Sequence, residues 1–311
     1  MQFQGTFCLR RVTAGAAAGL LLAAGASAQS LIQTSATTVA AFDDPAPGIP
    51  GSMFGLTSTF DNPVIDESGS SFFRGRFTGA TNTDDRGLFY GSNPGNLVLA
   101  VRSGDPAPGI PGVTLNSATS TGPGSNVRLS PDGIMLFGSN LDGATVTSSD
   151  NTAIFTGTPG SFSVLVREGD PAPGTVGAVF SSSFSSPSQQ SNNMRRGGEV
   201  VFKSSLSGGD VSGSTNNEGY FIGTPGSVSL LVRKGDPVLG GTNILSLGFV
   251  TQLNDPGQFL YDLLYDTAGG AAPASDADDR ALWIYTPGAG HFQVLREGDP
   301  APGTVGATFS K

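Results

Sequence analysis

Short hydrophobic runs, each ended by a polar or glycine-rich segment, recur along this chain after its first 28 residues. In the clearest stretch the runs cover 178–184, 198–206, 218–223 and 228–236 and are rich in Val, Phe, Tyr, Leu and Ile. Clusters of Gly, Pro, Asn and Ser bound each run, and none has a helical period. The pattern predicts four short antiparallel strands joined by tight turns.

A short motif marks the period at which this four-strand pattern repeats. The motif is GDPAPG or a close variant, and its Asp falls at Asp44, Asp105, Asp170, Asp236 and Asp299, so the steps are 61, 65, 66 and 63 residues. An even recurrence of this kind indicates one supersecondary unit copied in tandem. We expect units at about 44–104, 105–169, 170–235 and 236–298, with a partial unit at 299–311.

The turns inside each unit are equally regular. The second strand is entered by segments 66–73, 130–137, 195–202 and 254–261, in which a Gly suits a turn with positive φ and the aromatic residue four positions later is expected to face the core. Pro-Gly turns separate the third and fourth strands.

Four short antiparallel strands per copy are typical of a β-propeller blade, so the predicted fold is an all-β, propeller-like array of four-stranded blades. GDPAPG then joins the last strand of one blade to the first strand of the next, and an open stack of small sheets is the rival arrangement. The chain also begins with a fourth-strand segment at 37–42 and ends with a first-strand segment at 306–311. Because these two end segments would form only the fourth and first strands of a closing blade, the sequence predicts an incomplete ring in a chain that lacks part of that blade.

The first 28 residues have the features of a secretion signal. Arg10 and Arg11 precede a short apolar stretch, and Ala26-Ser27-Ala28 fits a small-x-small cleavage pattern. We therefore expect a signal peptide at 1–28, a single repeat domain at 29–311 and an extracellular, cell-surface or periplasmic location. No later apolar stretch approaches the roughly 20 residues of a membrane span.

Removal of this leader changes the available chemistry. The only cysteine, Cys8, leaves with it, so 29–311 has no disulfide, thiolate nucleophile or Cys-ligated metal. Two of the 16 basic residues leave as well, which gives 14 basic against 25 acidic residues, a net charge of −11. An acidic exported chain is not expected to bind nucleic acid. The 20 Phe residues recur inside the apolar runs, which argues against disorder despite 46 Gly and 21 Pro.

The alternation of an "NxxG" turn, a strand ending in Phe and "LVREGDPAPG" resembles a family of exported bacterial tandem-repeat proteins with an NxxGxxAF repeat and a variable C-terminal sorting anchor. Asn254 and Gly257 match the turn, while Asp66 with Gly69 and Ser130 with Gly133 keep its spacing. The resemblance covers about 37–311 and implies surface sorting without a defined biochemical role. No apolar anchor follows in this sequence.

Two sets of repeated polar residues are candidate sites. An Arg stands three residues before the motif Asp in four copies (Arg102, Arg167, Arg233 and Arg296, with Ala41 in the first copy), and an Arg–Asp pair either lines a ligand site or holds the connector in place. Pairs of Asp or Asn lead each third strand and offer oxygens of the kind that Ca²⁺ prefers. Asp276, Asp278 and Asp279 come closest to a calcium loop, although Asx-turns explain these residues without metal.

Nothing in the sequence forms a recognisable catalytic set. His291 is the only His, and no Ser-His-Asp or Cys-His set can be built without it. Trp283 replaces the Phe of the other copies, a conservative change and the one hint of asymmetry. We predict a non-catalytic exported interaction scaffold without a cofactor, whose partner is an extracellular protein or glycan, monomeric unless an incomplete ring closes by association. The alternatives are a carbohydrate-active hydrolase or lyase on a propeller and a calcium-stabilised adhesin.

Overall fold

The computed structural model describes residues 37–55, 60–79, 85–116, 125–185, 193–238, 242–266 and 278–310. One compact unit extends over Thr37–Lys311, and the predicted signal peptide lies outside the described residues. Within the described ranges, no helix is long and apolar enough to cross a membrane. The only helical segment there is a single 3₁₀ turn, η1 (Arg196–Gly198).

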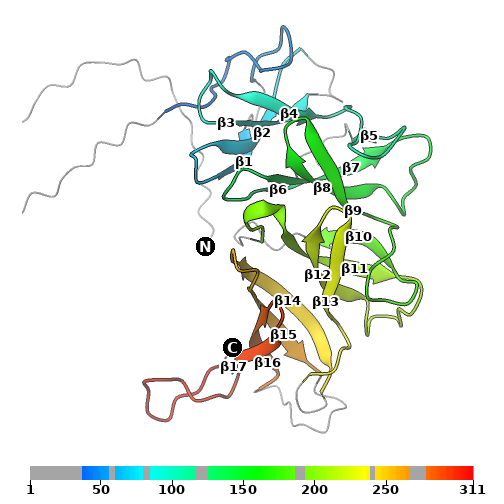
Figure 1. The fold of residues 1–311 in the computed structure, drawn as a ribbon, viewed down its shortest axis with the longest axis vertical. Helices are drawn as coiled ribbons and strands as arrows, with labels where there is room; N and C mark the ends of the chain where they lie inside the picture. Colours follow the sequence, from blue (N-terminus) through cyan, green and yellow to red (C-terminus); the bar gives the residue numbers. More distant parts are fainter. Residues whose placement is uncertain are drawn as a thin grey trace, which may run out of the picture. The chain divides into compact units, whose positions relative to one another are not determined.

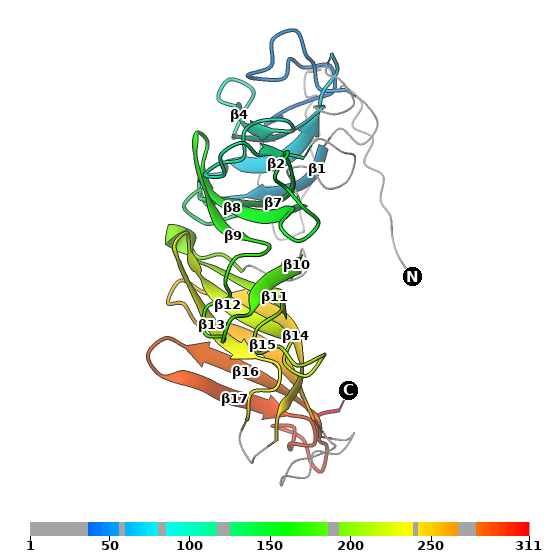
Figure 2. The ribbon, with the colours of Figure 1, turned by 90° about the vertical axis from the view of Figure 1, so that its right-hand side faces the viewer.

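The predicted all-β fold of four-stranded antiparallel sheets is confirmed, and Figure 1 shows the sheets following one another along the chain. The first sheet contains β1 (Phe60–Ile65), β2 (Ser71–Arg76), β3 (Arg86–Gly91) and β4 (Val98–Arg102). The third contains β10 (Val179–Ser185), β11 (Val200–Ser207), β12 (Glu218–Thr224) and β13 (Ser227–Arg233). The fourth contains β14 (Ile244–Leu253), β15 (Phe259–Tyr265), β16 (Arg280–Thr286) and β17 (Gly290–Arg296), with β17 at its edge (Figure 2).

The second sheet departs from this plan in its first strand. Two short strands, β5 (Thr114–Leu115) and β6 (Ser125–Leu129), pair with opposite ends of β7 (Met135–Asp142), which is followed by β8 (Thr152–Thr158) and β9 (Ser161–Arg167). The first strands of the other three sheets also carry register shifts against their partners. The first strand is therefore irregular in every repeat, and the pairing of the third strand with the fourth also carries a register shift in each sheet.

Glycine turns and buried aromatic residues position the inner strands as the pattern predicts. Gly69, Gly133 and Gly257 have φ between 83° and 86° in the turns before the second strands. Four residues after the turn glycine, an aromatic side chain is buried in each sheet: Phe73, Phe137, Phe202 and Tyr261.

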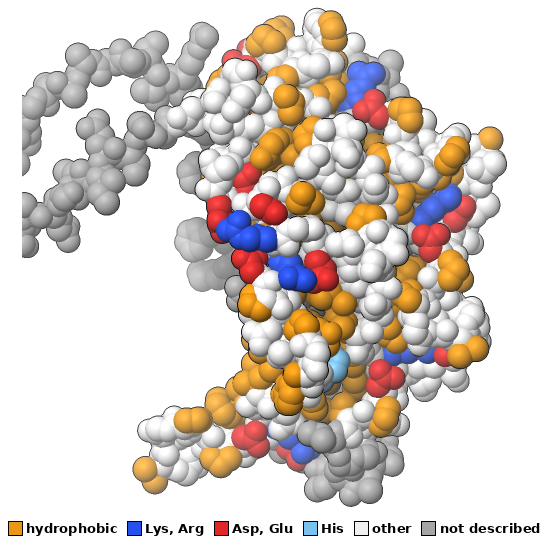
Figure 3. Space-filling model, in the orientation of Figure 1, with side chains coloured by type: hydrophobic (Ala, Val, Ile, Leu, Met, Phe, Trp, Pro, Cys, Tyr) orange, Lys and Arg blue, Asp and Glu red, His pale blue; other side chains and the backbone are white. Residues whose placement is uncertain are grey.

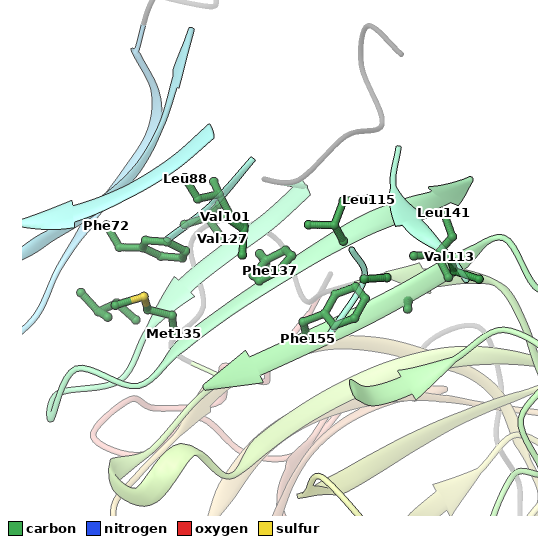
Figure 4. Packing of buried hydrophobic residues seen from close by; sticks show 13 residues of the cluster. Phe72, Leu88, Val101, Val113, Leu115, Val127, Met135, Phe137, Leu141 and Phe155 are labelled. Carbon is green, nitrogen blue, oxygen red and sulfur yellow. The ribbon is translucent and has the colours of Figure 1, made fainter. Parts of the chain in front are cut away.

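Successive sheets pack through two different faces. One face of the first sheet presents Phe72, Leu88 and Val101 to the second sheet, where Phe137 and Phe155 lie on the facing side (Figure 4). The same relationship joins the second sheet to the third and the third to the fourth. The core is therefore a series of intersheet layers, each combining a mainly aliphatic face of one sheet with the aromatic face of the next.

The aliphatic face of the fourth sheet has no such cover from described residues. Leu88, Ile154 and Tyr220 hold the equivalent position in the earlier sheets and are at most 2 % exposed, whereas Leu282 is half-buried. Phe292 on the neighbouring strand is 50 % exposed. The fourth sheet thus presents the type of surface on which a following sheet packs in the first three repeats.

The two predicted strands at the ends of the repeat region are not strands, which corrects the prediction. Residues 37–42 have no strand conformation, and 306–310 contribute only the isolated bridge between Pro300 and Thr308. The physical reason is that a strand needs a hydrogen-bonded partner, and no neighbouring strand pairs with either segment in the described part of the chain.

Candidate functional site

Each motif Asp caps a turn, which in the last four copies leaves the fourth strand of a sheet. Its carboxylate accepts a hydrogen bond from the backbone N–H three residues earlier, at 2.6–2.8 Å, in all five copies. The backbone N–H of the same Asp donates to the carbonyl of that earlier residue at 3.1–3.2 Å. The acceptors are Asp44, Asp105, Asp170, Asp236 and Asp299, and this shared geometry gives the motif Asp a structural role in the connector.

The motif arginines mostly reach a different acid. Among the four motif arginines, only Arg102 forms an ion pair with its own motif Asp through its guanidinium, with Nε 3.6 Å from Asp105. Arg167 pairs with Asp150 at 2.8 Å, and Arg233 donates to both carboxylate oxygens of Asp210. Asp150 and Asp210 precede the third strands of the second and third sheets, so these contacts tie the third strand to the fourth. In the first sheet the acid before the third strand, Asp85, pairs instead with Arg76 of the second strand.

The candidate calcium loop follows the same plan. Asp278 forms an ion pair with Arg296 at 3.0 Å, and its backbone carbonyl accepts from Arg296 Nε at 2.6 Å. Asp279 is buried, and Asp276 lies outside the described residues. Among the residues that the structure describes, no group of three His, Cys, Asp or Glu side chains is arranged to hold a metal ion.

A mixed charge cluster joins the second-strand turns of all four repeats. Arg196 in the third repeat forms ion pairs with Glu67 of the first and Asp255 of the fourth, the latter at 3.0 Å. The neighbouring N–H of Gly197 donates to Asp132 of the second repeat at 2.9 Å. Figure 3 shows basic and acidic side chains alternating in such small groups rather than forming a field of one sign. The charge of Arg196 is therefore paired with acids of other repeats, and these ion pairs link the repeats to one another.

The fourth sheet breaks the repeat on its aromatic face. The first three sheets carry stacked Phe pairs here, namely Phe73–Phe89, Phe137–Phe155 and Phe202–Phe221, with ring centroids 5.1–5.9 Å apart. In the fourth sheet the paired residues are Tyr261 and Trp283. The next residue across the sheet changes as well, from Leu99, Val164 and Leu230 to Gln293. Trp283 is therefore one of several coordinated changes, which corrects its interpretation as a conservative replacement.

The new polar atoms form two short hydrogen-bonded chains. The Tyr261 hydroxyl lies 2.6 Å from His291 Nδ1. The indole N–H of Trp283 donates to the Tyr265 hydroxyl at 2.9 Å, and that hydroxyl donates to Gln293 at 3.0 Å. Burial raises the pKa of both tyrosines, so both hydroxyls stay protonated near neutral pH.

His291 also connects the third and fourth sheets. Burial lowers its pKa, while a hydrogen bond with the backbone of Leu231 and the nearby charge of Asp236 act in the opposite direction. A neutral ring that donates to the Leu231 carbonyl leaves Nδ1 as the acceptor for Tyr261. The equivalent residues in the second and third sheets are Phe162 and Val228, which carry no polar atom in the side chain.

A cavity of about 550 Å³ opens at this altered face, between the third and fourth sheets. Figure 3 shows the single histidine, in pale blue, with hydrophobic side chains around it. Of the ten lining residues, only Asp236 and His291 carry a titratable group that responds near neutral or acidic pH. The full lining is Leu231, Val232, Asp236, Pro237, Val238, Ile244, Tyr261, Leu263, Trp283 and His291.

One protein-family model matches the chain twice, over residues 3–122 and 93–311. The chain belongs to the family of unknown function DUF7453. No curated protein matches it. Among solved structures, the chain is similar to an alpha-L-arabinanase of Penicillium chrysogenum complexed with arabinobiose, with 12 % identity, a TM-score of 0.32 and coverage of 84 % of this chain and 72 % of that one. That likeness is too distant to bear on what this DUF7453 protein binds.

Proposed function

We propose that this DUF7453 protein is an exported, non-catalytic interaction scaffold whose binding site lies in the fourth repeat. The leader at 1–28 and the resemblance to surface-sorted repeat proteins support export. The sheets serve as a frame that presents the site.

One observation carries this proposal: polar substitutions are concentrated on a single face of one repeat. A polar group placed in an apolar intersheet layer costs free energy unless it is hydrogen-bonded. Tyr261 and Trp283 are buried and His291 is half-buried, so these three changes are unfavourable for a purely structural repeat, whereas Gln293 is exposed. Tyr261, Trp283, His291 and Gln293 are all joined in hydrogen bonds, and a cavity lies beside them. Binding sites in repeat proteins arise where one copy departs from the pattern that builds the frame.

The repeated acids and arginines support the non-catalytic part of the proposal. The motif Asp residues accept backbone hydrogen bonds, and the arginines pair with acids of their own sheet. A catalytic acid needs a carboxyl group with access to substrate and a protonation state suited to proton transfer. The same backbone contact in all five copies favours a structural role for these carboxylates over a catalytic one.

The test is a variant that restores the repeat, Tyr261→Phe with Trp283→Phe, His291→Val and Gln293→Leu. We expect it to fold with an unchanged or higher melting temperature and to lose the binding that the native protein shows in a thermal-shift screen of small molecules. Equal binding by both proteins would place the site elsewhere and overturn the proposal. The non-catalytic part of the proposal would be overturned by a hydrolytic activity. That activity would appear as reducing ends released from polysaccharides by the native protein, and substitution of a single acid would abolish it.

A further inference from the structure

The cavity beside Trp283 has walls suited to an apolar molecule. Six of its ten lining residues are aliphatic or proline, contributed by β13, the connector and the two strands that follow, and two more are the aromatic Tyr261 and Trp283. Its volume of about 550 Å³ lies within the usual range for small-molecule sites. An occupant that fills it must bury mostly carbon.

Most polar atoms around the cavity are already engaged. The Tyr261 hydroxyl is bonded to His291, whose ring also bonds the backbone of Leu231. The Trp283 indole N–H is directed to Tyr265. A carbohydrate, which carries a hydroxyl on most of its carbons, would leave many of those groups without partners here.

Asp236 is the exception. One carboxylate oxygen, Oδ2, accepts from the backbone N–H of Arg233 at 2.7 Å, and within the described residues no hydrogen bond reaches Oδ1. The nearest cation, the Arg233 guanidinium, is held by both carboxylate oxygens of Asp210 and by the Asn216 carbonyl. By contrast, Asp105 in the second connector has the guanidinium of Arg102 3.6 Å away.

The charge on the chain favours the same kind of occupant. A net charge of −9 for the full sequence attracts cations and repels acids. Electron-rich Tyr and Trp rings also attract an ammonium group placed near them. Oδ1 of the half-buried Asp236 accepts no hydrogen bond from the described residues, and an ammonium group would supply both donors and positive charge there.

We propose that this cavity binds a small organic ammonium compound, with its apolar body against Val232, Ile244 and Leu263 and its ammonium group on Oδ1 of Asp236. This inference rests on the proposed function, because it names the ligand chemistry of the fourth-repeat site. It adds that recognition depends on one charged contact in an otherwise apolar cavity.

Three matched probes test the proposal: 4-phenylbutylamine, 4-phenylbutanol and 4-phenylbutyrate share one body and differ in their head group. Trp283 is the only tryptophan in the chain and lies in the cavity wall, so its fluorescence reports on occupancy directly. We expect the amine to bind at least about tenfold more tightly than the acid, as a charge-assisted hydrogen bond of ordinary strength gives. Added NaCl should weaken binding of the amine and leave that of the alcohol unchanged.

The matched variants are Asp236→Asn and Asp170→Asn. Asn keeps an oxygen for the backbone N–H, so both connectors should keep their turns, which melting curves check. Asp236→Asn should reduce amine affinity about tenfold and leave the alcohol unaffected, whereas Asp170→Asn, at the same motif position of another repeat, should change neither.

The outcomes separate this inference from the proposed function. Equal affinity for all three probes would overturn the ammonium assignment, and so would an affinity for the amine that does not change with added NaCl. Either result would leave a binding site in the fourth repeat. A flat Trp283 fluorescence signal and an unchanged melting temperature with every probe would overturn the cavity as the site. Failure of the proposed function itself would instead appear as unaltered binding by the repeat-restoring variant.

Discussion

The hydroxyl of Tyr261 lies 2.6 Å from Nδ1 of His291, at a position where the second repeat places Phe137 edge-on to Phe162. The ring geometry is retained, since the Tyr261 and His291 rings are also edge-on, with centroids 5.8 Å apart. A hydrogen bond has therefore been added to an existing packing arrangement. The fourth repeat keeps the frame of its neighbours and changes the chemistry of one face.

This pair predicts that stability depends on pH. Burial lowers the pKa of His291 below its usual 6.5, so the folded protein binds a proton less readily than the unfolded chain. The stabilising contribution is fully present above the unfolded-state pKa of about 6.5 and is lost as pH falls below it toward the lowered folded-state value. Chemical denaturation of the native protein should show decreasing stability over that window.

His291→Gln is the variant that isolates this effect. Gln can still accept from Tyr261 and donate to the Leu231 carbonyl, but it does not titrate. Burial raises the pKa of the adjacent Asp236, which acts with the opposite sign as pH falls and is present in both proteins. We expect the difference in unfolding free energy between the two proteins to shift against the native protein below pH 6.5. A difference that stays constant between pH 5 and 8 would show that His291 does not contribute.

The close packing of the connector on the sheet predicts a large effect at Gly174. A Cβ added there would lie 2.8 Å from Leu230 Cβ, and the backbone has φ of +76°. Gly160 has nearly the same φ, +80°, but no atom within 4 Å of an added Cβ. Gly160→Ala should therefore cost only the left-handed backbone strain, about 1 kcal/mol, whereas Gly174→Ala should cost about 1–3 kcal/mol more from overpacking. Urea denaturation of both variants measures the difference, and equal costs would mean that the connector moves away from Leu230 without penalty.

Much of this architecture could be predicted from the sequence, because strands and turns depend on local patterns. Val200–Ser207 and Glu218–Thr224 lie within two residues of their expected ranges, and the turn glycines have the expected positive φ. The Tyr261–His291 contact joins residues 30 positions apart and depends on a register shift between Leu282 and Trp283. Such a bulge decides which residue faces the cavity and has no clear signature in a single sequence.

The ion pairs of the repeat show the same limit. Arg167 was visible as a repeated residue, and Asp150 as part of a repeated Asx pair, but their contact across 17 residues requires the pairing of β8 with β9. The sequence nevertheless contains a signal for the candidate site, in the comparison of its four copies. Aligning the four copies by strand order shows that Tyr261, Trp283, His291 and Gln293 change together, which would have indicated the fourth repeat as the site.

The uncovered face of the fourth sheet predicts unequal costs at equivalent positions. Ile154 in β8 is 2 % exposed and packs against the third sheet, whereas Leu282 in β16 is half-buried. Ile154→Ala should cost about 2–5 kcal/mol, the range for a buried aliphatic side chain, and Leu282→Ala about 1 kcal/mol or less. The measurement is the free energy of unfolding at pH 7 and low protein concentration. A cost for Leu282→Ala equal to that for Ile154→Ala would mean that another part of the protein, or a second molecule, covers this face.

The pairing of Asp278 with Arg296 predicts that calcium does not stabilise the protein. A Ca²⁺ ion takes six to eight oxygen ligands, and it would have to displace the guanidinium that lies 3.0 Å from this carboxylate. A ligand that binds only the folded state stabilises it by RT ln(1 + [L]/Kd) and therefore raises the melting temperature. We therefore expect the same melting temperature in 5 mM CaCl₂ and in 5 mM EDTA, both at matched ionic strength. Arg296→Gln is the informative control, because it removes the guanidinium that pairs with Asp278. A calcium-dependent rise in this variant alone would identify the arginine as the group that excludes the metal. A rise in the native protein would favour the calcium-stabilised adhesin over the scaffold proposed above.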